Sequence, residues 1–318
     1  MEAFEYKRLL SQISRLYYLD NLTQQQIAGK LSLSRQKVQR FLKRAREEGV
    51  VRISIQPVTG VFPELERKLE KKYGLREAVV TEVFSYEDQV RSSLEVGAAA
   101  AEYLVRIISP GDRIVISWGG GLKGVVSALA GMEAPAKTIT VVQGLGGLGD
   151  PNNEVHGADL TRRLARYLGG KAVLLPSPGV AGSKEAKEKL LLDPYIAAAL
   201  REGRGADVAV MAIGAPRRNS ILVQEGKITS WGELQGLISR GAAGDINLRF
   251  FNEQGTAVKS DFDDRVIGLT LEEIKKIDCV IGIGGGAAKE AAIRGALKGN
   301  LIDVLVTDRI SAEKLAEE

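Results

Sequence analysis

The chain has 318 residues, of which 44% are hydrophobic, and its formal net charge at pH 7 is +4. This length and composition allow a substantial core and predict two domains in a water-soluble protein. No apolar run approaches the roughly 20 residues that cross a bilayer, and the charged N-terminus has no apolar signal core, so we expect a cytoplasmic protein. With one cysteine, Cys279, and one histidine, His156, we expect no disulfide and no structural metal.

The positive charge is concentrated at the start of the chain. Residues 1–56 contain 11 Lys and Arg against 5 Asp and Glu, a balance of +6. The remaining 262 residues contain 33 against 35, a balance of −2. The first domain is therefore the part that an anionic partner would bind.

Helical periodicity dominates the first 50 residues. Apolar residues predict a first helix over about residues 5–19. Thr23 is a candidate N-cap for a short second helix, and Ser34 is one for a third helix that ends at Gly49. Two helices joined by a turn of about three residues form a helix-turn-helix, whose second helix can lie in the DNA major groove. Alternation over residues 51–55 then predicts a strand that forms a small wing.

The third helix presents cations and amides away from its apolar face. Arg can pair with guanine and Gln with adenine, whereas Lys and Arg near the rim neutralise phosphate. A merely solvated charged face is the alternative, but the caps, the turn length and the charge asymmetry together favour DNA binding. We assign to the DNA interface Thr23, Gln24, Ser34, Arg35, Gln36, Lys37, Gln39, Arg40 and Lys43.

A linker and a larger domain follow. Proline and glycine punctuate residues 57–62, so we expect domains at 1–56 and 63–318 with a linker at 57–62. Seven apolar bursts, most of them followed by a helical stretch, predict an α/β fold with a Rossmann-like, mostly parallel sheet that is covered on both faces. The bursts lie at residues 78–83, 112–118, 138–143, 171–176, 207–214, 278–284 and 302–308.

Four loops of this domain are candidates for a ligand site at the carboxyl ends of the strands. In "ISWGGGLKG" and "CVIGIGGGAAKEAAI", a strand runs through glycines into a helix, and Lys289 lies near the start of the second helix. Exposed amides, a helix N-terminus and an ammonium suit a phosphate. In the other two loops, "QGLGGLGD" is rich in glycine and "SRGAAGDINLRFF" offers a carboxylate to sugar hydroxyls. The candidate residues are Gly119, Gly120, Gly121, Leu122, Gly146, Gly147, Asp245, Gly285, Gly286 and Lys289.

The segment "YYLDNLTQQQIAGKLSLSRQKVQRFLKRAREEGVVRISI" resembles the DNA-binding part of the SorC/DeoR-like family of bacterial sugar-responsive transcriptional regulators. The resemblance continues through "GDRIVISWGGGL", "GAAGDINLRFF" and "GIGGGAAKEAAIRGAL", and it covers almost the whole chain. It implies a domain that is similar in fold to sugar-phosphate isomerases and deaminases, binds a phosphorylated sugar or sugar alcohol, and alters the binding of operator DNA. It also implies a homodimer or homotetramer.

Three departures from the family pattern affect these expectations. Ser32 occupies a position where many helix-turn-helix turns have glycine, and we expect some backbone strain there. Gly121 and Leu122 replace a hydroxyl residue that contacts phosphate, and Leu145 replaces a basic residue. A bisphosphate effector, which needs cations at both ends, is therefore disfavoured, although Arg217 and Arg218 are candidates for a second cation.

Two other functions compete with a sugar-responsive repressor or activator. A sugar-phosphate isomerase or deaminase fused to a DNA-binding segment would need a positioned acid and base. His156 and the acidic residues Asp150, Glu154 and Asp159 near it show no recognisable catalytic pattern. A nucleotide-binding regulator is disfavoured because no dinucleotide fingerprint follows a strand, so we expect neither catalysis nor a cofactor.

Overall fold

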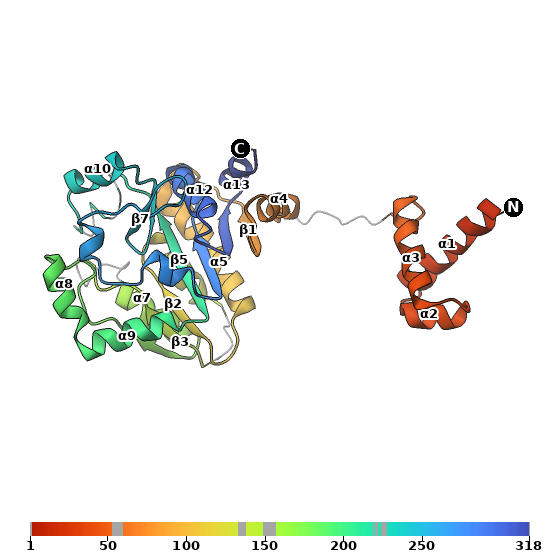
Figure 1. Ribbon diagram of the computed structural model, residues 1–318, viewed down its shortest axis with the longest axis horizontal. Helices are drawn as coiled ribbons and strands as arrows, with labels where there is room; N and C mark the ends of the chain where they lie inside the picture. Colours follow the sequence, from red (N-terminus) through yellow and green to blue (C-terminus); the bar gives the residue numbers. More distant parts are fainter. Residues whose placement is uncertain are drawn as a thin grey trace. The chain divides into compact units, whose positions relative to one another are not determined.

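A computed structural model describes residues 2–52, 60–132, 138–148, 157–218, 220, 222–223 and 228–317 (Figure 1). The chain divides into two compact units, Met1–Val58 and Thr59–Glu318, which we describe separately. Most of the predicted wing strand and part of the predicted linker lie outside the described residues.

The first unit contains three helices, α1 (Glu2–Tyr18), α2 (Gln24–Lys30) and α3 (Arg35–Glu47). Both predicted N-caps are confirmed. Thr23 forms a capping box with Gln26, and the Ser34 side chain accepts a hydrogen bond from the backbone of Lys37. The buried residues that hold the three helices together are Leu10, Ile13, Leu16, Ile27, Ala28, Val38, Phe41, Leu42 and Ala45.

The turn between α2 and α3 places Ser32 in the left-handed region, with φ of 53°. Most residues with a Cβ avoid this region, which explains why glycine is common at such a position. The expected strain at Ser32 is therefore present, and it is the cost of the sharp change of direction that sets α3 across α2.

Seven strands of the second unit lie parallel in the order β1-β9-β8-β5-β2-β3-β4. All seven predicted bursts are strands of this sheet. The strands are β1 (Glu77–Thr81), β2 (Arg113–Ile116), β3 (Thr140–Gln143), β4 (Lys171–Val173), β5 (Val208–Gly214), β8 (Cys279–Ile283) and β9 (Val304–Asp308).

Helices cover both faces of the sheet, as continuous apolar strands require. One face carries α5 (Gln89–Ile107), α6 (Gly120–Leu129) and α7 (Gly157–Tyr167). The other carries α4 (Pro63–Tyr73), α8 (Lys184–Leu191), α9 (Pro194–Arg204), α11 (Leu271–Ile274), α12 (Glu290–Lys298) and α13 (Arg309–Glu317). Among the described helices, none is long and apolar enough to cross a membrane.

A smaller apolar cluster contains Trp118, the helix α10 (Trp231–Ser239) and the hairpin β6 (Gly244–Ile246) to β7 (Arg249–Phe251). The segment that we predicted to be a loop around Asp245 is this hairpin. β6 pairs antiparallel with β5 and continues the sheet beyond the end of β5. The strands are too short for the periodicity of the sequence to reveal them.

We predict that Ser34→Ala destabilises α3 by about 1 kcal/mol, because the Ser34 hydroxyl accepts the Lys37 amide at 3.2 Å. Hydrogen exchange of the α3 amides in the full chain should become roughly fivefold faster. Ser11→Ala, at an exposed position inside α1, is the control and should leave α3 unchanged. Equal exchange in the two variants would show that the cap does not stabilise α3.

Candidate DNA-binding and effector sites

The exposed face of α3 has the composition that the sequence predicted. Its buried residues Val38, Phe41, Leu42 and Ala45 all face the core. The residues that we assigned to the DNA interface on α3 are all exposed, namely Arg35, Gln36, Lys37, Gln39, Arg40 and Lys43.

Some cations of α3 form ion pairs or hydrogen bonds with neighbouring side chains, and others do not. Lys43 pairs with Glu47 at 3.7 Å. Arg44 donates to the Tyr6 hydroxyl at 3.1 Å, and Tyr6 in turn donates to Glu48. Within the described part of the chain, no ion pair involves Arg35 or Arg40. These two guanidinium groups, and that of Arg46 near the end of α3, are therefore available to an external anion.

A groove of about 780 Å³ lies at the junction of α1 and α2, and Arg35 at the start of α3 also lines it. It brings together three predicted interface residues, Thr23, Gln24 and Arg35, with the aromatic pair Tyr17 and Tyr18. The two tyrosine rings meet edge to face, with centroids 5.0 Å apart. Helical periodicity assigns Tyr17 to the core and gives Tyr18 no role, so the sequence analysis did not predict this groove. The two tyrosine hydroxyls close to the capped start of α2 in the sequence were a signal that could have indicated it.

In the second unit, the candidate site lies where β2, β5 and β8 end. β2 lies between β3 and β5, the kind of position at which open α/β sheets bind ligands. Helix α6 begins there at Gly120, and its N-cap Gly119 has φ of 107° and no side chain to cap the first turn. A Cβ on Gly121 would lie 3.0 Å from Ile283 at the end of β8. The two glycine-rich loops therefore lie against each other.

Gln89, in the first turn of α5, links these two loops. Its amide nitrogen donates to the Gly285 carbonyl at 2.9 Å and to the Ser93 hydroxyl at 3.0 Å. A Cβ on Gly120 would lie 3.2 Å from Ser93 Cβ. Gln89 and Ser93 were not among the predicted site residues, although two adjacent serines in an otherwise apolar helix face were an available signal.

Asp308, at the end of β9, supports the second loop from the other side. Its buried carboxylate accepts from the Gly286 amide at 2.7 Å and from the amide and hydroxyl of Ser311. This contact corrects one expectation, since the Gly286 amide is already used within the chain. A carboxylate at the end of an apolar strand was the signal for this role.

Asp245 lies against Gly214, the last residue of β5, and interacts electrostatically with Lys289 in the segment after β8. Burial is the main cause that raises the pKa of Asp245 to about 6, while the Leu248 amide and the charge of Lys289 oppose it. Burial likewise lowers the pKa of Lys289 to about 8, against the charge of Asp245. Lys289 ends a short 3-10 turn, Ala287–Lys289, and directly precedes α12. The buried Asp245 and the half-buried Lys289 thus place two groups of opposite charge, both harder to ionise than in water, at the carboxyl ends of β5 and β8.

The loop with Gly146 and Gly147 differs from the expectation. The Gly146 amide donates to Ile267 at 3.0 Å, and the Gly147 amide donates to Ser177 at 2.8 Å. A Cβ on Gly146 would lie 2.4 Å from the Pro178 carbonyl oxygen. Close packing of three loops is therefore what these glycines allow, and their amides are not available to an anion.

Other residues considered from the sequence have less to contribute. Arg217 and Arg218 follow β5 and are exposed. Trp118 is buried in the small apolar cluster, and the side chain of Leu122 is buried under α6. His156, Asp150 and Glu154 lie outside the described residues.

We predict that Asp245→Asn raises the free energy of unfolding at pH 7 by about 1–2 kcal/mol. The folded-state pKa of Asp245, about 6, lies above the ordinary value of 3.8. As the pH rises from 4 to 6, the unfolded carboxyl therefore loses its proton first and the wild type loses stability, whereas asparagine cannot ionise. The gain is limited because Lys289 loses its counter-charge.

Urea unfolding at pH 4 and pH 7 measures this difference. Asp261→Asn, at an exposed position, is the control and should show no such widening between the two pH values. A constant difference between Asp245→Asn and the wild type across this range would contradict the buried charge.

Comparison with known proteins agrees with the two kinds of domain. Residues 58–317 match a family described as "Putative sugar-binding domain", and residues 20–52 match a winged helix-turn-helix DNA-binding family. The deoxyribonucleoside regulator of Bacillus subtilis (strain 168) is 30% identical over 315 residues, 99% of each chain. The sorbitol operon regulator of Klebsiella pneumoniae is 30% identical over 324 residues, again 99% of each.

Solved structures agree as well. The full-length sorbitol operon regulator SorC from Klebsiella pneumoniae has a TM-score of 0.72 and 29% identity, and the match covers 97% of this chain and 98% of that one. A DeoR family transcriptional regulator from Listeria monocytogenes has a TM-score of 0.72 and 28% identity, over 80% of this chain and 98% of that one. The chain therefore belongs to the SorC/DeoR-like family of transcriptional regulators, with a DNA-binding helix-turn-helix followed by a sugar-binding domain.

Proposed function

We propose that this regulator binds operator DNA through α3 and is controlled by a phosphorylated sugar or sugar alcohol in the crevice at the ends of β2, β5 and β8. One observation carries the proposal. The uncapped first turn of α6 lies against Ile283 at the end of β8, and the buried Asp245 interacts electrostatically with the half-buried Lys289 at the ends of β5 and β8, beside a topological switch point.

The phosphate would bind between α6 and Lys289. The amides of Gly120, Gly121 and Leu122 belong to the first turn of α6, which no side chain caps, and the helix dipole favours an anion there. The Lys289 ammonium supplies a full positive charge. Because Gly121 and Leu122 offer no hydroxyl, backbone amides and Lys289 are the proposed ligands.

The sugar hydroxyls would bind near Asp245. One of its carboxylate oxygens accepts the Leu248 amide at 3.2 Å, which leaves acceptor capacity for a ligand. Two of the relatives are named for sorbitol and for deoxyribonucleosides, which supports a polyol or a sugar as the effector. Arg217 and Arg218 are exposed, and among the described residues Lys289 is the one cation whose charge affects the pKa of Asp245, which favours a monophosphate.

The effector would act by changing the arrangement of an oligomer. A helix-turn-helix reads half-sites about one helical turn apart, so a homodimer or homotetramer is the assembly that we propose, in the cytoplasm where operator DNA is. The effector can change DNA affinity only by its differential affinity for the two arrangements, typically about 1–3 kcal/mol. The relatives carry the names of regulators, which supports binding without turnover of the effector.

Thermal unfolding with a panel of pentose, hexose and tetritol phosphates, and with their unphosphorylated forms, tests the effector class. We expect a phosphorylated member to raise the melting temperature, because a ligand that binds only the folded state stabilises it. A panel in which the unphosphorylated compounds stabilise the protein equally would remove the phosphate from the proposal. Steady formation of product from any member would instead favour the enzyme.

Calorimetric titration of the stabilising compound from pH 7 to pH 9.5 tests Lys289. Its pKa of about 8 in the free protein means that it loses its charge above this pH, and phosphate binding then requires proton uptake. Affinity should fall by up to about tenfold per pH unit above pH 8. Lys289→Arg keeps its charge and should flatten this decline, and Lys289→Met should weaken binding at every pH. Wild-type affinity that is constant up to pH 9.5 would exclude Lys289 from the phosphate site.

Operator binding by variants of α3 tests the DNA interface. Arg35→Ala and Gln39→Ala should reduce the preference for the operator over other sequences by about 1–3 kcal/mol. Lys43→Ala should weaken the binding of all DNA sequences alike. The DNA affinity of the wild type should fall steeply as the salt concentration rises. Lys298→Ala, an exposed cation of the second unit, is the control. If Arg35→Ala, Gln39→Ala and Lys43→Ala all bound like the wild type, α3 would not be the recognition helix.

A further inference from the structure

The two edges of the parallel sheet are treated differently. At the β1 edge, two side chains of α4 accept outward-facing backbone amides. Glu70 accepts the Ala78 amide at 3.1 Å, and Glu66 accepts the Val80 amide at 3.0 Å. These carboxylates occupy the donors that another strand would use, so the β1 edge is closed to further pairing.

The β4 edge has no such protection in the described part of the chain. The Lys171 amide donates inward to Ile139 at 2.9 Å, and the Leu175 amide donates inward to the Gln143 side chain. Because amides alternate along a strand, those of Ala172 and Leu174 face outward. Neither has a hydrogen-bond partner among the described residues. Two outward donors thus remain on the last strand of the sheet.

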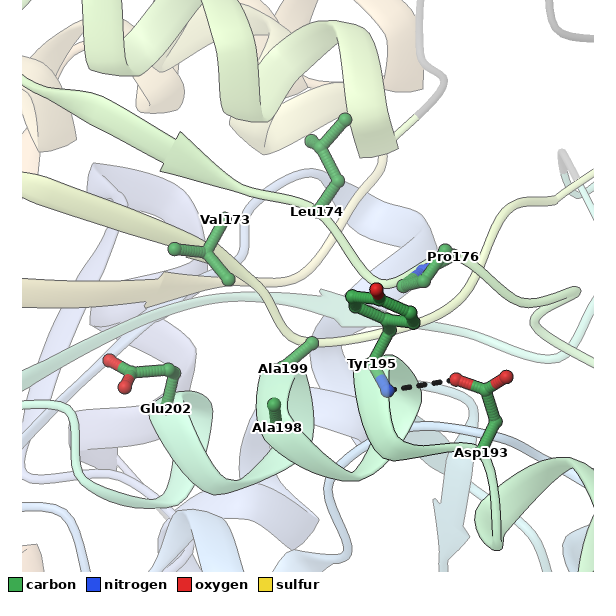
Figure 2. A pocket seen from close by; sticks show the side chains of 8 residues that line it. All are labelled: Val173, Leu174, Pro176, Asp193, Tyr195, Ala198, Ala199 and Glu202. Carbon is green, nitrogen blue, oxygen red and sulfur yellow. Dashed lines mark hydrogen bonds between the residues drawn. The ribbon is translucent and has the colours of Figure 1, made fainter.

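An apolar groove of about 530 Å³ lies beside this open edge, between β4 and α9 (Figure 2). Val173, Leu174 and Pro176 line it from the strand side, and the Tyr195 ring lies close to Pro176 on the side of α9. Tyr195 is 77% exposed, and the neighbouring Leu192 is 83% exposed. Large apolar side chains with this exposure, next to unpaired backbone groups, are typical of an interaction surface.

We propose that a second copy of this chain covers this surface, with the β4 strands of two subunits paired antiparallel about a two-fold axis. The inference rests on the oligomer of the proposed function and specifies its surface. In a two-fold interface, the same surface of both subunits must be complementary to itself. An open strand edge meets this condition, because its backbone donors and acceptors can pair with those of an identical strand that runs antiparallel to it. The apolar side chains at Leu192 and Tyr195 lose their water in the same step.

The charged residues around the groove also favour a second copy of this chain as the partner. Asp193 caps α9 with one carboxylate oxygen, and no ion pair involves it among the described residues. Glu202, at the other end of the groove, pairs with Arg113 at 3.0 Å. Lys171 is exposed at the start of β4, and alternation places its side chain on the same side as Val173, towards α9. Antiparallel pairing brings Lys171 of the partner subunit towards the end of the groove at Asp193.

Sedimentation equilibrium of the full chain, with variants of β4 and α9, tests the surface. Ala172→Pro removes an outward amide that the sheet does not use, and proline is tolerated at such an edge position. Leu192→Glu puts a charge into the proposed contact. Both should reduce the mass to half that of the wild type, with unchanged far-UV circular dichroism. Ala172→Val, which keeps the amide, and Phe84→Glu, at a site that is 92% exposed in the loop after β1, should keep the wild-type mass.

Hydrogen exchange of the Ala172 and Leu174 amides gives a second measurement. They should exchange slowly in the wild type and at least tenfold faster in Leu192→Glu, so this comparison decides the matter even if Ala172→Pro does not fold. An oligomer whose mass and exchange survive both variants would overturn the surface but leave the oligomer itself standing. A wild type that is monomeric would instead reject the oligomer of the proposed function.

Discussion

The close approach of α5 and α6 is the contact on which the second unit depends. A Cβ on Gly97 would lie 2.7 Å from Gly124 Cα, so only glycine at these positions lets the two helices come so near. That approach places the uncapped start of α6 directly over the ends of β5 and β8, and it brings Gln89 of α5 within reach of the Gly285 loop. Two loops that are far apart in the sequence become one crevice.

Within this crevice, the chain keeps groups in states that a folded core normally avoids. Burial makes both Asp245 and Lys289 harder to charge. The carboxylate of Asp245 also holds the hairpin turn at Asn247 and Leu248, whose φ values of 59° and 61° fit a type I′ turn. Leucine rarely adopts such a conformation, but its side chain is fully buried in the small apolar cluster. In the proposed site, a phosphate would offset the charge of Lys289, and a sugar hydroxyl would donate to Asp245, the residue that holds this strained turn.

The first unit follows simpler rules. Its fold depends on two capped helix starts and nine buried residues. The proposed recognition face consists of the residues of α3 that stay exposed when those nine residues pack together. The position of Arg35 and Gln39 could therefore be predicted from periodicity alone. The pairing of Lys43 with Glu47, one helical turn apart on α3, is likewise a matter of spacing. The hydrogen bonds of Tyr6 with Arg44 and Glu48 and the groove at Tyr17 and Tyr18 could not be predicted, because they depend on how separate helices meet.

The sequence by itself determined most of the elements, because they arise from local rules; the hairpin of β6 and β7 is the exception. The helix caps, the seven parallel strands, the concentration of charge in the first 56 residues and the glycines after β2 and β8 all follow from residue type and spacing. Tertiary packing decided which glycine amides stay available. Gly146, Gly147 and Gly286 resemble Gly121 in the sequence, yet their amides bond to Ile267, Ser177 and Asp308. Hydrogen-bond partners that lie more than 20 residues away leave no periodic trace, so only the folded chain separates an anion site from a packing contact.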